Sequence, residues 1–186
     1  MVALFDLWLP ILVAAVFVFV LSSLFHMVIP LHKGDYAKLP AEDAMLAALR
    51  EHGLRPGDYA FPLASSMKEM ATPEMIEKLN RGPVGFMHVL PNGPMAMGKN
   101  LGAWFLYSVL IGVFVAYAAS LSMPRAVDGM LAFRFTAAIA TLAYATANVP
   151  ASIWQGQRWT VTAKFAVDGL VYGLATGAAF AWLWPA

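Results

Sequence analysis

Four long apolar stretches constrain the fold of this chain more than any other feature of its sequence. They cover residues 4–30, 101–121, 130–149 and 165–184 of 186, and each is close to or above the roughly 20 residues with which an α-helix crosses a bilayer. A helix satisfies its own backbone hydrogen bonds and is therefore stable where water is absent. Only 12% of the residues are charged, against about 25% in an ordinary soluble domain. We predict an all-α integral membrane protein with four transmembrane helices.

The polar stretch 31–100 separates the first of these helices from the other three. It predicts a small mixed α/β insertion between the first and second helices. The chain then divides into a first transmembrane helix over 4–30, a cytoplasmic or interfacial insertion over 31–100, and a three-helix transmembrane region over 101–186. About seventy residues of modest apolar content make a marginal core. We therefore expect the insertion to pack against the membrane surface or against the helices.

Local signals predict three elements inside the insertion. A short helix begins near Pro40, where acidic residues follow, and Gly53 ends it. A second helix covers residues 73–79, because Thr72 is a good N-terminal cap and proline is favoured at the first helical position. Residues 84–90 read as a strand that ends in a turn rich in proline and glycine.

Lysine and arginine are distributed unevenly between the two predicted sides of the membrane. Residues 31–100 hold eight of the twelve basic side chains, and Arg158 and Lys164 lie in the linker before the last helix. Only Arg125 and Arg134 fall on the opposite side. Cytoplasmic loops carry the excess of lysine and arginine in membrane proteins. We therefore predict that both termini are periplasmic and that the loop 31–100 is cytoplasmic.

Small residues recur every four positions on two of the predicted helices. This spacing places them on one helical face, where another backbone can approach closely. The predicted packing residues are Gly112, which shares its face with Ser108, Ala116 and Ser120, and the three glycines Gly169, Gly173 and Gly177. We expect these faces to pack within one subunit or between subunits. They favour a non-enzymatic membrane protein that assembles as a homo-oligomer or as an accessory subunit of a larger membrane complex.

Polar and ionisable side chains also occur inside the apolar stretches, where an unpaired charge is costly. Lys164 and Asp168 lie one turn apart near the inner end of the last helix, and antiparallel threading brings the inner ends of other helices to them. The predicted intramembrane polar cluster consists of His26, Asn148, Lys164, Asp168 and Tyr172. In the simplest interpretation, Lys164 neutralises Asp168 and the cluster holds the helices in register.

The same cluster supports two alternative functions. A small proton- or ion-coupled transporter or channel would use Asp168 as its proton or cation site, and it would need an oligomer because four helices are few for a carrier. A lipid- or quinone-binding membrane enzyme would need a pocket between the helices that is large enough for its ligand. At the outer ends of the helices we predict an ion pair between Asp6 and Arg134.

No cofactor, metal site or catalytic residue is predicted. The chain has no cysteine, which excludes thiolate ligands and nucleophiles, and it lacks the common hydrolase, phosphate-loop, dinucleotide and zinc-protease motifs. His26 and His32 are six residues apart across Pro30, a poor spacing for one helical face. With His88 and Asp35 they could form a site from loops, but interfacial histidines are the simpler interpretation. The eleven methionines could bind copper(I), although adaptable packing also explains them.

Two stretches carry a resemblance to a known family. HMVIPLHKGDYAKLP after the first helix and SIWQGQRWTVTAKFAVDGLVYG leading into the last resemble an uncharacterised family of small bacterial inner-membrane proteins. The resemblance covers most of the chain and implies a bacterial inner membrane, but it brings no activity, ligand or catalytic residue. With a net charge of +1 no nucleic acid is expected as a partner, and the expected partners are membrane lipid and other subunits.

Overall fold

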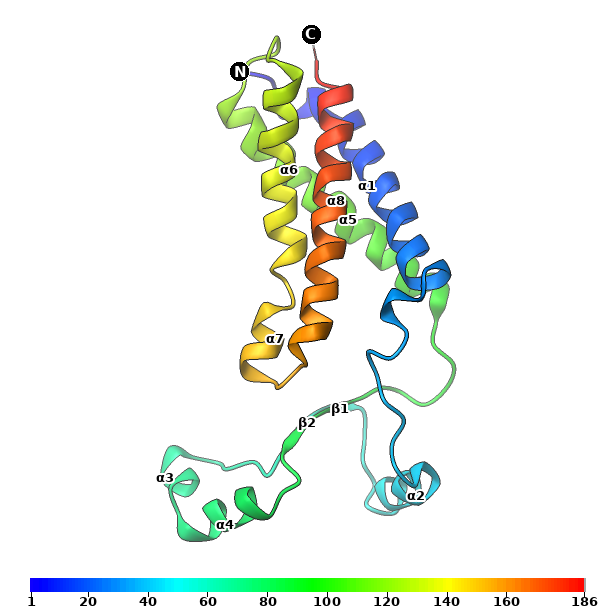
Figure 1. The fold of residues 1–186 in the computed structure, drawn as a ribbon, viewed down its shortest axis with the longest axis vertical. Coiled ribbons are helices and arrows are strands. Elements are labelled where there is room, and N and C mark those ends of the chain that lie inside the picture. The colour runs from blue at the N-terminus through cyan, green and yellow to red at the C-terminus, as the bar shows by residue number, and fades with distance from the viewer. Residues whose placement is uncertain (186) are drawn as a thin grey trace. The chain divides into compact units, whose positions relative to one another are not determined.

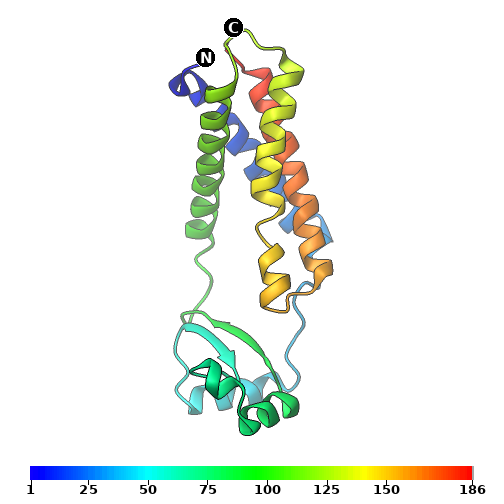
Figure 2. The ribbon, with the colours of Figure 1, turned by 90° about the vertical axis from the view of Figure 1, so that its left-hand side faces the viewer.

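The computed structural model describes residues 1–185, which form two compact units. The membrane unit comprises Met1–Asp35, Ala96–Ile153 and the chain from Gln157 onward. The insertion unit comprises Tyr36–Met95 together with Trp154–Gly156. Each unit is described by itself below, and Figures 1 and 2 show the elements of both.

The membrane unit contains four helices long and apolar enough to span a bilayer, as predicted. The first span, Leu4–Val28, joins the 3-10 turn Leu4–Leu7, helix α1 (Trp8–Ser23) and a π-helical turn (Leu24–Val28). The remaining elements are α5 (Met97–Ser122), α6 (Gly129–Ala145), α7 (Val149–Trp154) and α8 (Trp159–Trp182). Together, α6 and α7 make the third span. By the length and composition of these helices, the chain is a multi-pass membrane protein.

Two helices extend beyond the apolar stretches that predict them. The second span begins at Met97 rather than at residue 101, and the last begins at Trp159 rather than at residue 165. Hydropathy marks where apolar side chains begin, whereas a helix continues into polar sequence until a residue ends it. The third span is interrupted after Ala145, and Pro150 lies in the first turn of α7, the helical position where its missing N–H costs least.

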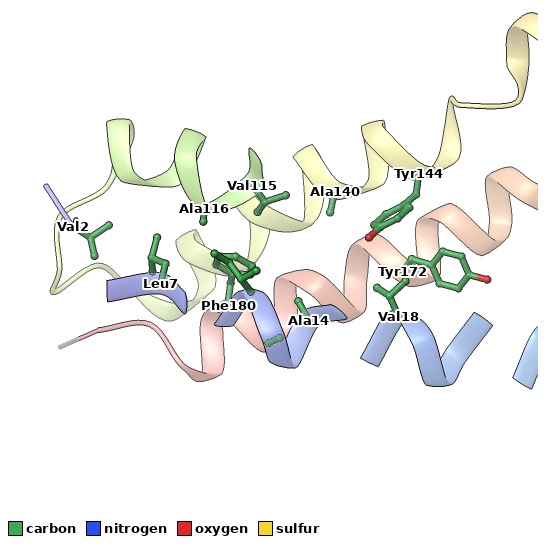
Figure 3. Packing of buried hydrophobic residues seen from close by; sticks show 12 residues of the cluster. Val2, Leu7, Ala14, Val18, Val115, Ala116, Ala140, Tyr144, Tyr172 and Phe180 are labelled. Atoms are coloured by element: carbon green, nitrogen blue, oxygen red, sulfur yellow. The ribbon is translucent and has the colours of Figure 1, made fainter. Parts of the chain in front are cut away.

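The spans run antiparallel to their neighbours along the chain, so that both termini lie at one end of the membrane unit (Figure 1). Helix α8 packs against α6 along its length and also against α1, which in turn packs against α5. Figure 3 shows the core between these helices, where Leu7, Val18, Val115 and Phe180 are fully buried.

The three glycines of α8 lie at the contact with α6. A Cβ atom added to Gly173 would lie 2.7 Å from the backbone nitrogen of Thr141, and one added to Gly177 would lie 2.6 Å from the Cβ of Ala137. Both distances are shorter than real carbon contacts, so only glycine permits this approach of the two backbones. Gly169 faces Ala145 in the same way. The glycine face of α8 is thus covered within the subunit.

Gly112 of α5 has a similar but looser environment. A Cβ atom there would lie 3.1 Å from the side chain of Ile11 on α1. Its neighbours Ser108 and Ala116 are buried on the same face of α5. The small-residue face of α5 is therefore also occupied by a helix of the same chain.

The ion pair expected at the outer end has a different basic partner. Asp6 binds Arg125, with 2.5 Å between the carboxylate Oδ2 and the guanidinium, and not Arg134 as predicted. The Val2 N–H donates to the Met123 carbonyl at 3.1 Å, which holds the N-terminal segment beside the loop that carries Arg125. Arg134 is exposed on α6.

The insertion unit contains α2 (Glu42–Glu51), β1 (Gly57–Phe61), α3 (Met67–Met70), α4 (Pro73–Arg81) and β2 (Gly85–Val89). The two helices and the strand predicted from local signals correspond to α2, α4 and β2. In α4 the Thr72 hydroxyl accepts from the Met75 N–H at 3.3 Å, the expected N-terminal cap. Strand β1 was not predicted; it pairs antiparallel with β2, with Tyr59 opposite Met87. Met75 is buried in this unit.

A matched pair of alanine substitutions tests the contact between α6 and α8. Gly173→Ala should lower the free energy of unfolding by about 1–3 kcal/mol, as overpacking does, because the added methyl group meets the backbone of Thr141. Gly102→Ala, on α5 with nothing within 4 Å of the added atom, should be neutral or stabilise by up to about 1 kcal/mol through helix propensity. Thermal unfolding in detergent, followed by circular dichroism, measures both. Equal midpoints for the two variants would contradict the contact.

Candidate functional site

A cavity of about 460 Å³ is lined by residues of all four spans, near the C-terminal end of the first span and the N-terminal ends of α5 and α8. Aromatic side chains make much of its wall, including Trp104 and Tyr107 of α5, Tyr144 of α6 and Tyr172 of α8. The tyrosines of α6 and α8 meet edge to face, with ring centroids 5.7 Å apart, and Figure 3 shows them at one end of the core. Asp168 also lines the cavity and is 1% exposed.

The chain turns back at Pro30 and places residues 30–35, here called the return segment, against α8. His32 of this segment lies between two carboxylates. Its Nε2 is 2.8 Å from Asp168 Oδ2, and its Nδ1 is 2.6 Å from Asp35 Oδ2. Because both ring nitrogens are at hydrogen-bond distance from carboxylate oxygens, each contact requires a proton.

The charges around His32 balance when those two protons are present. Two protons shared among Asp35, His32 and Asp168 leave the three groups with one net negative charge. Lys164 supplies the compensating positive charge, since its Nζ lies 2.5 Å from Asp35 Oδ1. A buried network of this kind is stable only when its charges are paired.

Asp35 lies outside the membrane-spanning segments, and its pKa reflects these contacts. Burial by itself would raise the pKa of the carboxyl group. Hydrogen bonds from Lys164 and His32, with the positive charge near them, outweigh burial and hold the pKa below its ordinary value. Asp35 is therefore ionised at neutral pH and is an acceptor for both neighbours.

Hydrogen bonds from the Arg158 side chain to backbone carbonyls hold the return segment to the start of α8. The guanidinium of Arg158 donates to the carbonyl oxygens of Gly34 and Asp35, each at 2.8 Å. Together with the contacts of His32 and Lys164, these bonds fix the segment at several points. The polar network is thus built from two parts of the chain more than 120 residues apart.

The last member of this polar network is His26, which lies in the π-helical turn after α1. Its ring stacks on that of His32, with centroids 4.2 Å apart and planes 9° from parallel. Its Nδ1 lies 3.0 Å from the carbonyl oxygen of Ser22. A carbonyl only accepts, so Nδ1 carries a hydrogen and Nε2 of the neutral ring keeps a free lone pair. The Ser22 hydroxyl accepts from the Trp104 indole N–H at 2.8 Å.

Two buried polar atoms at the cavity have no hydrogen-bond partner among residues 1–185. They are Oδ1 of Asp168 and the hydroxyl oxygen of Tyr172. An unpaired buried polar atom costs about 1–3 kcal/mol, and native structures keep few of them. Both residues line the cavity, so a bound molecule there could supply the missing partners.

The structure brings together most of the predicted polar cluster. His26, Asn148, Asp168 and Tyr172 all line the cavity. Lys164 differs, because it binds Asp35 rather than neutralising Asp168 as expected. The reason is that His32, from the return segment, already occupies the carboxylate of Asp168.

The predicted polar cluster did not include His32 and Asp35, which the sequence suggested only as possible parts of a site formed from loops. Their spacing of three residues places them together after a proline, and this was the available signal. The argument from a shared helical face failed for His26 and His32, because the chain reverses between them at Pro30. His88, the other histidine considered, pairs with Asp58 across the strands of the insertion unit.

Comparisons of the chain with protein-family models, with curated proteins and with solved structures found no match. The resemblance to small bacterial inner-membrane proteins therefore stays a prediction. The function has to be inferred from the geometry of the site.

The pairing of Lys164 with Asp35 can be tested by neutralising one partner. Asp35→Asn should lower the free energy of unfolding by about 2 kcal/mol, less than the ~3–5 kcal/mol of a fully buried pair because the Lys164 side chain is 29% exposed. The matched control is Glu42→Gln, which breaks the exposed pair with Lys38 and should cost under about 0.5 kcal/mol. Thermal unfolding in detergent at pH 7 compares them. A smaller loss for Asp35→Asn than for the control would refute the pairing.

Proposed function

We propose that the protein binds a membrane-soluble molecule with a planar, oxygen-bearing head, of the quinone and quinol class, in the cavity between its helices. One observation carries the proposal: two buried polar atoms without partners, Asp168 Oδ1 and the Tyr172 hydroxyl, belong to the wall of an otherwise largely apolar and aromatic cavity. Binding sites for small molecules commonly combine an apolar wall with a few polar groups that orient the ligand.

The size of the cavity supports a ligand of this class. Its volume of about 460 Å³ falls within the 300–1,000 Å³ typical of small-molecule sites. A single substituted ring fills only part of that space, which leaves room for the first portion of an apolar tail. A complete phospholipid with two acyl chains exceeds it, so the head of a quinone fits the volume better.

The two unpartnered atoms complement the two ends of such a head. The Tyr172 hydroxyl would donate to one ring oxygen in either oxidation state, and Asp168 Oδ1 would accept from the other ring oxygen when it carries a hydrogen, as it does in the quinol. The rings of Trp104 and Tyr144 offer aromatic surfaces on which a planar molecule can pack. Binding of the quinol would thus satisfy both buried atoms at once, and binding of the quinone would satisfy the Tyr172 hydroxyl.

Assembly through small-residue faces remains a prediction with less support. The glycines of α8 lie against α6 and Gly112 lies against α1, so these residues do not leave a free face for a second subunit. An assembly would have to use another surface. The cavity, in contrast, is present within one chain.

For the location, we propose a bacterial inner membrane, with both termini periplasmic and the insertion cytoplasmic. The concentration of lysine and arginine in residues 31–100 supports this orientation. Alkaline phosphatase fused at the C-terminus should be active, and a green fluorescent protein fused there should not fluoresce. Fusions placed after Gly53, in the insertion, should give the opposite pair of results. The reverse pattern would overturn the orientation.

Quinone binding can be measured through the fluorescence of Trp104. A short-chain ubiquinone analogue added to the protein in detergent should quench tryptophan emission in a saturable manner. Tyr172→Phe removes one proposed hydrogen bond and should weaken binding about 3–10-fold, as expected for a bond worth about 0.5–1.5 kcal/mol. Tyr117→Phe, on an exposed part of α5, should bind as the wild type does.

Two controls separate binding in the cavity from partition into the detergent. Saturable quenching should disappear in Trp104→Phe and persist in Trp182→Phe, because Trp182 lies about 21 Å along α8 from Asp168 by helical rise. Without ligand, Tyr172→Phe should also be about 1 kcal/mol more stable than the wild type, because it removes an unsatisfied buried hydroxyl. Equal affinities of the wild type and Tyr172→Phe would refute the proposed contact.

A further inference from the structure

Three side chains at the edge of the cavity present metal-binding atoms to one another. His26, His32 and Asp168 each offer one such atom, and these atoms all lie within 4.8 Å of each other. They come from the π-helical turn, the return segment and α8. Two imidazole nitrogens and one carboxylate oxygen form a common ligand set for a divalent transition-metal ion with open positions.

Both histidines are already oriented by a second hydrogen bond. In metal sites, the ring nitrogen that does not bind the metal usually donates to a carboxylate or a backbone carbonyl, which selects the tautomer and fixes the ring. His32 makes this contact to Asp35 at 2.6 Å, and His26 makes it to the Ser22 carbonyl at 3.0 Å. Nε2 of His26 then keeps a free lone pair, and Nε2 of His32 becomes available to a metal when the proton that it shares with Asp168 leaves.

The burial of Asp168 is a separate observation that points to a bound ion. Its side chain is 1% exposed, and Oδ1 has no partner among the residues that the structure describes. A buried carboxylate that keeps an unpartnered oxygen can accept a further donor or cation beside it. The remaining oxygen, Oδ2, lies 2.8 Å from His32 Nε2, where a shared proton holds the two atoms together.

We infer that His26, His32 and Asp168 form a binding site for a divalent first-row transition-metal ion such as Zn²⁺. The ion takes the place of the proton between His32 and Asp168. In a tetrahedral zinc site the ligand atoms are about 3.3 Å apart, given bonds of about 2.0 Å, so these two atoms separate by about half an ångström. The fourth position is left for water or for a molecule in the cavity.

The choice of ion follows from the donor atoms. Mg²⁺ and Ca²⁺ prefer sets of oxygen ligands, and copper(I) prefers sulfur. Two imidazoles with one carboxylate suit Zn²⁺, Fe²⁺ or Co²⁺. His26 is exposed on the surface of the membrane unit, two residues from the end of the first span. The two proposed sites share Asp168 but use different oxygens, Oδ2 for the metal and Oδ1 for the quinol, so the metal site does not require the cavity to be filled.

The test uses the full-length protein in detergent, without a polyhistidine tag and stripped of metal by a chelator. Zn²⁺ is titrated in competition with a chromophoric chelator, and Co²⁺ is titrated with its visible absorption recorded. The wild type should bind one equivalent of either ion, and the Co²⁺ bands should have the intensity of four- or five-coordination. His26→Ala should lower the affinity at least 10-fold. Because His26 is exposed and makes its hydrogen bond within its own helix, this variant loses only ring packing and should still fold.

Matched variants distinguish this site from adventitious binding. His88→Ala removes an exposed histidine of the insertion unit and should bind like the wild type. Asp35→Asn should weaken Zn²⁺ binding about 10–100-fold, the usual effect of losing a group that orients a metal ligand. Equal affinities of the wild type and His26→Ala, or less than one equivalent bound by the wild type, would overturn the proposal. Tyr172→Phe should bind Zn²⁺ normally, so the metal site and the quinone site can fail separately.

Discussion

Close contact between the backbones of α6 and α8 is the interaction on which the rest of the membrane unit depends. In a bilayer, the surrounding lipid is as apolar as the helices, so association has to come from packing and hydrogen bonds. Gly173 and Gly177 allow α6 to approach without intervening side chains. This contact brings Tyr144 against Tyr172 and sets the depth of Asp168, which lies one turn before Tyr172 on α8. The glycines of α8 thus position the cavity and the polar groups in its wall, although they make no side-chain contact with either.

The return segment adds what the helices alone do not supply. Four helices with an aspartate buried among them would leave its carboxylate without a proton donor. Residues 30–35 bring His32 to Asp168 and Asp35 to Lys164, and Arg158 holds the segment by its backbone. The stretch that joins the first helix to the insertion is therefore part of the site and not a simple linker.

The sequence predicts the helices of this protein far better than it predicts the site. Span number follows from hydropathy because length and apolarity are local properties, and α4 follows from Thr72 and Pro73 for the same reason. Asp168 and Tyr172 could be identified because polar residues inside apolar stretches are conspicuous. The pairing of Lys164 with Asp35, of Asp6 with Arg125 and of β1 with β2 joins residues distant in the chain. Such pairings depend on the direction that each loop takes, and the periodicity of apolar residues in helices and strands does not predict that direction.

The π-helical turn over Leu24–Val28 gives this part of the chain an unusual sensitivity to length. Its Ile29 N–H donates to the Leu24 carbonyl at 2.8 Å, a bond that spans five residues where an α-helix spans four. One residue more or less here rotates everything that follows by about 100° around the helix axis. Substitutions in this turn leave the rotation unchanged. A deletion, in contrast, would separate the rings of His26 and His32 and would change the direction in which the chain leaves Pro30. This stretch should therefore tolerate substitutions better than insertions or deletions, because only a change of length alters the direction of the chain that follows.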